Sequence, residues 1–465
     1  MKELKPKIGL EIHTEVKTKS KMFCACPNKE SEIPNFFICA VCTGQPGALP
    51  TINKEAVIKT IKLGIALGGK INFKTYFVRK NYFYPDLPKN YQISQYELPL
   101  VEGGKVNFFL QEKECLVNLR RIHLEEDAGK MIHFSNFSLV DFNRAGAPLI
   151  EIVTEPTISN SSEAYAFAQE LMLILRYLDI SDANPEKGQI RFEANVSVGY
   201  GDELGARVEI KNLNSLRSLK EAIDYEIARQ KDLILNGLEV VQETRGWDEN
   251  RRITFTQRRK EEAHDYRYFP EPDLVPIDLS NLSIEKIKTP FEIRKEIMLN
   301  YGLNIKEVEV LIWQKWALEF FEDLFKILPK DKENIKIVFN YLTTDLFGLV
   351  EKYKENRIGV KEFAELVKLF RENKISSRMF KDFLQKVFEG EKIENLYENK
   401  KIEDVEIIKL IIEEVLRENE NAVLDFKKGK QNAFEFLIGQ CMKKTEGKID
   451  PDLTRQILKE FLLNL

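Results

Sequence analysis

Helix-breaking residues are unevenly distributed along this chain, and their distribution constrains its fold more than any other feature. Fifteen of the 17 prolines and 16 of the 23 glycines lie at or before Pro290. The segments after Pro290 are rich in Glu, Lys, Leu, Ile and Phe, a composition and spacing typical of helices where breakers are rare. We therefore predict an α+β protein, with mixed α and β structure over residues 1–290 and only helices after them.

The helical part is expected to divide again near residue 410. This gives three expected domains, at residues 1–290, 291–410 and 411–465, in agreement with the typical domain length of roughly 150 residues. Near the end of the chain, Asp450 followed by Pro451 is a helix-start signal. A short last helix is expected from there to about Leu462.

Charge and hydropathy exclude some classes of protein. The formal net charge is −4 and 43% of the residues are hydrophobic. A uniformly basic nucleic-acid coat is thereby excluded, whereas local basic patches are compatible with these values. The first residues lack the apolar core of a signal peptide, and no run of 18 apolar residues occurs. We expect a cytoplasmic protein without a membrane span.

Periodicity predicts particular strands and helices in the first part. Apolar and polar residues alternate, as in strands with one buried face, in residues 8–16, 190–198 and 207–211. Helices are expected at about residues 54–67, 161–178 and 216–235. Asn160 and Glu163 have the spacing of a capping box at the start of the second helix. One-sided alternation favours an antiparallel sheet with one face on a core.

Four of the six cysteines are close together in the sequence. They are Cys24, Cys26, Cys39 and Cys42. Four thiolates in two tight pairs can surround one tetrahedral Zn²⁺, and four sulfur ligands make such a site structural. Two disulfides, which a cytoplasmic chain disfavours, and four unrelated core cysteines are the alternatives. We predict a structural zinc site at residues 24–42.

An acidic residue recurs in five strand-like segments, at Glu11, Glu125, Glu151, Glu193 and Glu209. If these strands are neighbours, the carboxylates converge on one sheet face, where repulsion raises their pKa values unless a cation neutralises them. Mg²⁺, a hard cation with oxygen ligands, suits such a cluster. His13 shares the face of Glu11, and because histidine is less usual for Mg²⁺, Mn²⁺ could substitute. The alternative is an ordinary solvated sheet face.

Other motifs give weaker signals. Residues 64–70 have the spacing of a phosphate loop but lack its Ser or Thr, and we interpret them as a helix stop. The chain has no G-x-S-x-G nucleophile elbow. If a reaction on this chain consumes ammonia from glutamine, another chain should therefore release that ammonia. Cations with aromatic rings or clustered lysines occur at residues 79–92, 251–269 and 427–444. Such segments suit nucleotide bases or single-stranded nucleic acid, and solvated turns are the alternative.

Several long motifs, spread in order over nearly the whole chain, resemble one family. They are IGLEIHTEV, RKNYFYPDLPKNYQISQYE, HLEEDAGK, VDFNRAGAPLIEIVTEP, EIKNLNS, DYRYFPEPDLVP and FEFLIGQCMKKTEGKIDP. These segments are similar to those of the B subunit of the glutamyl-tRNA/aspartyl-tRNA amidotransferase. The resemblance implies a cradle-like domain on an antiparallel sheet, then a helical domain and a small helical tail that binds tRNA.

The resemblance also implies a reaction. ATP phosphorylates the side-chain carboxylate of Glu or Asp on a mischarged tRNA, and ammonia then displaces phosphate to give Gln-tRNA(Gln) or Asn-tRNA(Asn). The enzyme is a C–N ligase of the EC 6.3.5 type. An amidase A subunit releases the ammonia from glutamine, and a small C subunit completes a heterotrimer.

The family motifs map onto particular residues of this chain. The metal candidates are Glu11, His13, Glu125 and Glu209. Glu125 is preferred to Glu126 because it shares a strand face with His123. Further catalytic candidates are Glu151 and Glu193. The candidates to neutralise a phosphoryl group of ATP are Arg79, Lys80 and Lys211.

Without the resemblance, the residues fit two other functions about equally well. One is a zinc-stapled, tRNA-binding scaffold without catalysis, which predicts that Glu11→Gln leaves the activity of the complex intact. The other is a small-molecule carboxylate–ammonia ligase, which predicts activity without tRNA and a dispensable tail.

Overall fold

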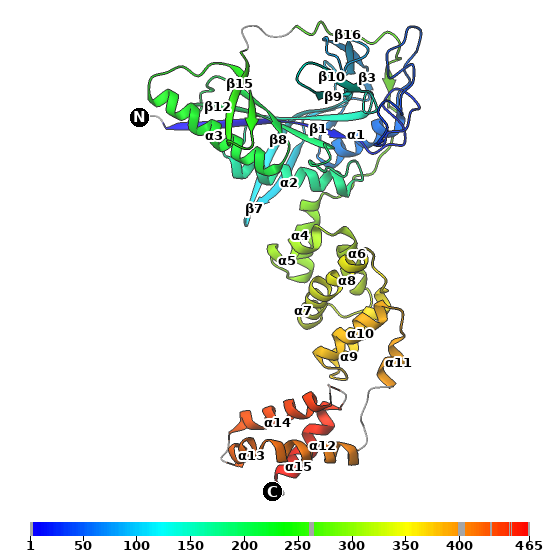
Figure 1. Cartoon of the computed structure of the whole chain (residues 1–465), viewed down its shortest axis with the longest axis vertical. Coiled ribbons are helices and arrows are strands. Elements are labelled where there is room, and N and C mark those ends of the chain that lie inside the picture. The colour runs from blue at the N-terminus through cyan, green and yellow to red at the C-terminus, as the bar shows by residue number, and fades with distance from the viewer. Residues whose placement is uncertain are drawn as a thin grey trace. The chain divides into compact units, whose positions relative to one another are not determined.

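The computed structural model describes residues 3–259, 265–398, 405–427, 430–445, 447 and 449–463. The chain forms two compact units, Met1–Lys295 and Glu296–Leu465. The first is mixed and the second helical, which confirms the α+β class (Figure 1). The division into three domains stays a prediction. His264 and Lys428, from the segments at 251–269 and 427–444, lie outside the described residues.

A ten-stranded sheet organises the first unit. Its strands are β1 (Leu4–Glu15), β2 (Lys70–Ile71), β6 (Val101–Glu102), β7 (Lys105–Leu110), β8 (Lys113–Glu126), β11 (Pro148–Thr154), β12 (Ile190–Tyr200), β13 (Val208–Leu213), β14 (Glu243–Asp248) and β15 (Ile253–Arg259). The strand order is β15-β14-β13-β12-β1-β11-β8-β6-β2, and β7 pairs with β8 beside this path. The acidic segments predicted from the sequence therefore lie on adjacent strands.

One pairing in this sheet differs from the antiparallel expectation. β13 and β14 are parallel, whereas the other strand pairs of the sheet are antiparallel. The reason is the helix α3 (Leu216–Leu235), which connects the two strands as a crossover. The alternation in β13 could not reveal this, because it reports only which face is buried.

Three shorter sheets complete the strands of this unit. They pair β3 (Lys74–Thr75) with β17 (Ile277–Asp278), β4 (Val78–Asn81) with β5 (Tyr91–Ser94) and β16 (Phe269–Pro270), and β9 (Lys130–His133) with β10 (Ser138–Asp141).

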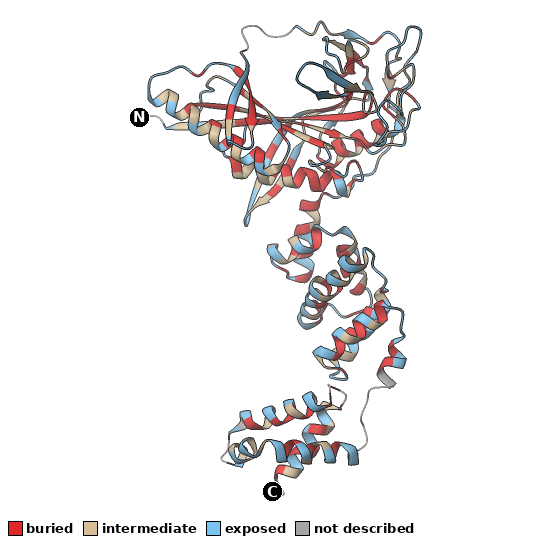
Figure 2. Cartoon of the chain, viewed as in Figure 1, coloured by how far each residue is buried: buried red, intermediate tan, exposed pale blue. Residues whose placement is uncertain are grey.

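Helices bury one face of the large sheet. These helices are α1 (Lys54–Ala66), α2 (Ser161–Tyr177) and α3 (Figure 1). Apolar side chains such as Leu10 of β1, Phe167 of α2 and Ile223 of α3 share one core and are fully buried. Figure 2 shows the buried residues along the sheet and the helices that cover it. The predicted helices are confirmed, with ends that agree to within one residue.

Side chains at the helix ends explain why these helices begin and stop where they do. Gly68, with φ +70°, follows α1, which confirms a helix stop where a phosphate loop was the alternative. Asn160 accepts the N–H of Glu163, as predicted for a capping box. The Glu163 carboxylate, however, accepts the N–H of Ser159, one residue earlier than in a regular box.

The second unit is built from helices. They are α4 (Pro290–Tyr301), which begins in the first unit, α5 (Ile305–Ile312), α6 (Lys315–Leu324), α7 (Lys332–Tyr341), the π-helix η1 (Leu342–Leu346), α8 (Phe347–Tyr353), α9 (Val360–Arg371), α10 (Ser377–Phe388), α11 (Ile393–Glu398), α12 (Val405–Glu418), α13 (Glu420–Lys427), α14 (Gln431–Lys444) and α15 (Pro451–Leu463). Phe321, Phe363 and Phe380 are among its fully buried side chains. Asp450 caps α15 as predicted, because its carboxylate accepts two backbone N–H groups. None of the helices in the described ranges has the length and apolarity needed to cross a membrane.

Candidate active site and metal centres

The sheet face opposite the core carries a row of glutamate and histidine side chains, which we call the acidic row (Glu11, His13, His123, Glu125 and Glu151). The register pairs His13 of β1 with Glu151 of β11, and Glu151 with His123 of β8. Glu151 therefore lies between two imidazoles from the strands on either side. On the other edge of β1, which faces β12, Glu11 is paired with Glu193.

Distances within the acidic row are short enough for ligands of a shared cation. Nε2 of His13 lies 3.5 Å from Oε2 of Glu151, 3.7 Å from Oε1 of Glu11 and 3.8 Å from Oε1 of Glu125. Nε2 of His123 lies 3.4 Å from Oε2 of Glu151. Two overlapping sets of donor atoms, each within 4.8 Å of one another, are Glu11, His13 and Glu151, and His123, Glu125 and Glu151.

Burial makes this face unlike an ordinary solvated one. Only 2% of Glu125 and 4% of Glu151 is exposed. Burial, and next the charge of Glu151, raises the pKa of Glu11 to about 7. Burial also raises the pKa of Glu125. Ionising these buried carboxylates therefore costs free energy, and a bound cation would lower that cost.

The two histidines differ in charge. Burial lowers the pKa of His13, but its hydrogen bond to Glu151 and the surrounding carboxylates raise it to about 9. Burial lowers the pKa of His123 to about 4, which keeps this imidazole neutral. Burial raises the pKa of Glu151, yet the two neighbouring histidines, of which His13 carries the positive charge, hold it well below its usual range. The ionised carboxylate of Glu151 beside the neutral imidazole of His123 is a donor pair that suits Mg²⁺ or Mn²⁺.

Glu193, Glu209 and Lys211 form a second group on the same face. Nζ of Lys211 lies 3.0 Å from Oε2 of Glu193 and 3.3 Å from Oε1 of Glu209. Glu209 also accepts a hydrogen bond from Thr244, at 3.0 Å. The structure thus brings three of the four metal candidates together with Glu151. Glu209 lies beyond β12 and belongs to neither set of donor atoms found in the described residues.

Arg79 and Lys80 are neighbours on β4 with different surroundings. Arg79 makes two hydrogen bonds of 2.8 Å to the buried carboxylate of Glu271 and lies over the ring of Tyr91. Nζ of Lys80 lies 5.1 Å from the centroid of the Tyr266 ring and has no hydrogen bond or ion pair to any described residue. Burial lowers the pKa of Lys80, but the charges of Glu125 and other groups raise it overall, so the negative charge of the acidic row stabilises this cation.

Adjacent carboxylates in β8 have separate roles. Glu126 accepts hydrogen bonds from Nζ of Lys89 and from the backbone N–H of Ile93. Glu125 accepts one from Ser94, at 3.2 Å, and points to the histidines. This geometry supports the preference for Glu125 over Glu126 as a metal candidate.

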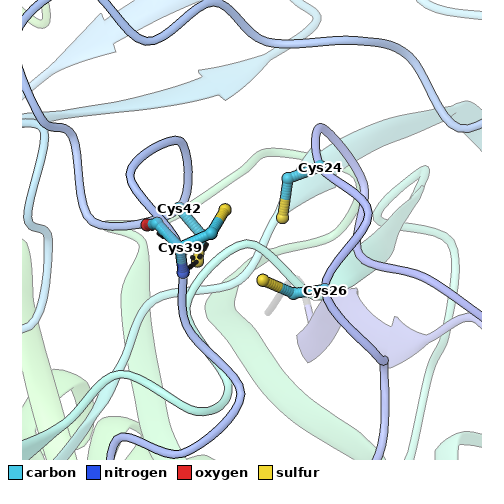
Figure 3. A group of neighbouring side chains, drawn as sticks. All are labelled: Cys24, Cys26, Cys39 and Cys42. Atoms are coloured by element: carbon cyan, nitrogen blue, oxygen red, sulfur yellow. Dashed lines mark hydrogen bonds between the residues drawn. The ribbon is translucent and has the colours of Figure 1, made fainter.

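The four clustered cysteines lie together, with their sulfur atoms directed at a common space (Figure 3). All four Sγ atoms are within 4.8 Å of one another, and those of Cys39 and Cys42 are 3.9 Å apart. Sulfur ligands at about 2.3 Å from a tetrahedral zinc are separated by about 3.8 Å. The cysteines are free thiols, so the two-disulfide alternative does not describe this structure.

Surrounding groups favour a thiolate at Cys42. Its Sγ accepts the N–H of Cys39 at 3.2 Å and lies 3.7 Å from Nζ of the buried Lys21. A hydrogen bond from the Cys24 thiol is the main cause that lowers the pKa of Cys42 to about 4. The donor set therefore fits Zn²⁺, and Lys21 would offset part of the negative charge of four thiolates.

Comparison with known proteins places the chain. Residues 6–285 match the GatB/GatE catalytic domain, and residues 319–462 match the GatB domain. The chain belongs to the GatB/GatE family. Its relatives include proteins named as B subunits of the aspartyl/glutamyl-tRNA(Asn/Gln) amidotransferase. That of Thermotoga maritima is 42% identical over 477 residues, with 98% of this chain and 99% of the relative covered. That of Campylobacter jejuni is 43% identical over 470 residues, with 98% and 99% covered.

Two residues of this GatB/GatE family member, His123 and Arg121, were not proposed from the sequence as members of the site. His123 served there only to choose between two glutamates, yet it lies in the acidic row. The signal was present, because His123-Leu124-Glu125 alternates as Glu11-Ile12-His13 does. Arg121, whose guanidinium lies 3.5 Å from Glu151, had no comparable signal because arginine is common on solvated strands.

Proposed function

We propose that this chain is the part of an amidotransferase that activates and amidates glutamate or aspartate attached to a mischarged tRNA. Its relatives are named as B subunits of an aspartyl/glutamyl-tRNA(Asn/Gln) amidotransferase. We assign the reaction to the EC 6.3.5 ligases. A carboxylate oxygen of the substrate attacks the γ-phosphorus of ATP, and ADP leaves. Ammonia then attacks the acyl carbon, and phosphate leaves with the former carboxylate oxygen.

The acidic row is the observation that carries the proposal, because it concentrates ionised and neutral donors on one sheet face. Glu11, Glu151 and Glu125 would hold Mg²⁺ there, with the neutral imidazole of His123 beside them and His13 as a further ligand once it loses its proton; the ion would neutralise charge on the phosphates of ATP. The side chains of Lys80 and Arg121 are further positive charges that could neutralise the transferred phosphoryl group, independently of the metal. Glu193 and Glu209, held by Lys211, are candidates to accept the proton that ammonium must lose before it attacks.

Partners and the remaining parts follow from the same assignment. We infer that an amidase A subunit supplies ammonia, that a small C subunit completes a heterotrimer, and that the complex acts in the cytoplasm. The helical segment at residues 411–465 is the candidate tRNA-binding tail. The cysteine cluster is assigned a structural zinc ion.

The two alternative functions are less well supported. A non-catalytic scaffold gives no reason to bury the carboxylates of Glu125 and Glu151 side by side. A small-molecule ligase gives no reason for the second, helical unit. Neither function agrees with the names of relatives that match nearly the full chain.

Phosphate release from ATP by the assembled complex tests the proposal, with ammonium in place of glutamine so that the amidase step is bypassed. Wild type is expected to release phosphate only with Glu-tRNA or Asp-tRNA. Glu11→Gln is expected to slow this release by about 100-fold or more, the size of effect seen when one group that stabilises a transition state is removed. The control is Glu239→Gln, at an exposed glutamate. Full activity of Glu11→Gln would favour the scaffold, and release without tRNA would favour the small-molecule ligase.

A further inference from the structure

Four tyrosines from two distant parts of the sequence lie beside the acidic row. We call them the tyrosine cluster (Tyr82, Tyr96, Tyr266 and Tyr268). The rings of Tyr96 and Tyr268 are stacked, with centroids 4.2 Å apart and planes 6° from parallel. Tyr266 meets Tyr268 edge to face at 5.9 Å and Tyr82 at 6.1 Å. Residues 265–270 thus extend the aromatic surface that residues 82–96 begin.

The outer ring of this cluster is open. Tyr96 is 46% exposed, although Tyr268 and the other two tyrosines are partly buried. A tyrosine that served only for packing would gain from covering both ring faces. Here Tyr268 stacks on Tyr96 and the Arg121 guanidinium also lies over the Tyr96 ring, while nearly half of the residue stays exposed. A base would therefore stack on the exposed part of Tyr96 beside this cation, a combination that proteins use for nucleobases.

Two cations connect the tyrosine cluster with the acidic row. The guanidinium carbon of Arg121 lies 5.7 Å from the centroid of Tyr96, and the same group lies 3.5 Å from Glu151. Nε of Arg121 is buried and has no hydrogen-bond partner in the described part of the chain. Lys80 connects Tyr266 with Glu125 and Glu151 in the same way, through a ring contact on one side and charge on the other.

We propose that the tyrosine cluster binds the adenine base of a substrate by stacking on Tyr96, while the sugar or phosphate of that adenosine meets Arg121 and Lys80. This inference rests on the proposed function, which brings two adenosines to the acidic row. One belongs to ATP, and the other is the terminal adenosine of the tRNA, to which the amino acid is esterified. Arg121, which lies near both the Tyr96 ring and Glu151, connects a base at Tyr96 with the acidic row.

Steady-state kinetics of the full complex separate these two sources. Phosphate release is measured with ammonium as nitrogen donor, varying ATP at saturating Glu-tRNA and then Glu-tRNA at saturating ATP. Tyr96→Ala removes the ring, and Tyr96→Phe keeps it without the hydroxyl. Tyr200→Ala is the matched control, because Tyr200 is 43% exposed and makes no ring contact with the cluster in the described part of the chain.

Loss of one stacked base predicts a rise of about tenfold in the KM of one substrate for Tyr96→Ala. A rise for ATP alone identifies its adenine as the ligand, and equilibrium dialysis of ATP with the full-length chain should show the same loss. A rise for Glu-tRNA alone identifies the terminal adenosine. Tyr96→Phe and Tyr200→Ala are expected to stay within twofold of wild type for both substrates.

The inference is overturned if Tyr96→Ala leaves both KM values within twofold of wild type, or if Tyr96→Phe is as defective as Tyr96→Ala. Failure of the proposed function has a different result, since wild type itself would then release no phosphate in response to charged tRNA. An active wild type with an unaffected Tyr96→Ala variant would thus remove the stacking site and leave the proposed function intact.

Discussion

At the scale of single residues, the acidic row combines attraction and repulsion across neighbouring strands. Glu151 lies between two imidazoles, of which that of His13 is charged, whereas Glu11 is paired across the strands with another carboxylate, Glu193. Like charges directly opposite each other destabilise a sheet. This arrangement opposes folding in the absence of a cation, and its presence in the middle of the sheet points to a chemical role.

Replacing Glu11 by a neutral residue should therefore stabilise the metal-free protein. Its pKa in the folded protein, about 7, exceeds the value of 4.5 for an ordinary glutamate, so its contribution to stability is lost as pH rises through 7. At pH 8, in a chelator, we expect Glu11→Gln to melt several degrees above wild type in a thermal scan. Millimolar Mg²⁺ should raise the melting temperature of wild type and have little effect on the variant. Equal metal-dependent shifts would show that Glu11 is not a ligand.

Lys80 should act on the reaction without supporting the fold. Its ammonium faces the acidic row without a direct ion pair in the described residues, so Lys80→Met should lower the rate of tRNA-dependent phosphate release by about 100-fold. Lys113→Met, at an exposed lysine, is the control. A slowed rate accompanied by a lower melting temperature would instead indicate that Lys80 is needed for folding.

The cysteine cluster should hold one zinc ion per chain, measured by elemental analysis of the purified protein. Replacing Cys24 and Cys42 together by Ser should abolish zinc binding, because two of four sulfur ligands are lost. Cys115→Ser, outside the cluster, should keep the metal. Zinc retained in the double variant would assign the metal to another site.

At the scale of elements, periodicity was enough to place α1, α2, α3 and the core-facing sides of β1, β12 and β13. It failed for pairings between strands, because alternation does not encode which strand lies next to which. The site shows the same limit. Glu11, His13 and Glu151 could be proposed from their strand positions, but the central place of Glu151, the inclusion of His123 and the outlying place of Glu209 follow from strand order alone. Arg79 and Lys80 likewise needed the structure to separate an ion pair from a cation without one.

The start of α1 shows how an element is tied to the cysteine segment. The Asn53 side chain accepts the N–H groups of Glu55 and Ala56 and donates to the carbonyl groups of Ser20 and Lys21. Asn53→Ala should lower the free energy of unfolding by about 2 kcal/mol, because both the cap and the link are lost. Asn160→Ala, which loses mainly a cap, should lower it by about 1 kcal/mol. Both are measured as shifts of the unfolding transition of the first unit, and equal losses would argue against a stabilising link.

At the scale of the whole molecule, the chain is two compact units, each with buried aromatic side chains of its own. Phe167 is fully buried in the first unit, where it meets Phe108, and Phe363 is fully buried in the second, between Phe320 and Phe380. A single free energy of unfolding is therefore not a suitable description of this protein.

Each unit should respond to its own core substitution. Phe167→Ala and Phe363→Ala each leave a cavity that costs about 3–5 kcal/mol. In scanning calorimetry we expect each to lower one transition, and the double variant to show both shifts without coupling, since substitutions that share no partners usually add. A single transition lowered by both substitutions would contradict this expectation.

The register that aligns His13, Glu151 and His123 also limits where insertions and deletions can be accepted during evolution of the sequence. Adding or deleting one residue inside β1, β8 or β11 would turn every following side chain of that strand to the opposite face, and would exchange carboxylates for Leu and Ile. Length changes are therefore tolerated only in the turns, such as those at Gly103 and at residues 135–136. The function of these three strands therefore depends on their register. A one-residue shift within them would remove the acidic row from its sheet face while leaving the amino-acid composition of the protein almost unchanged.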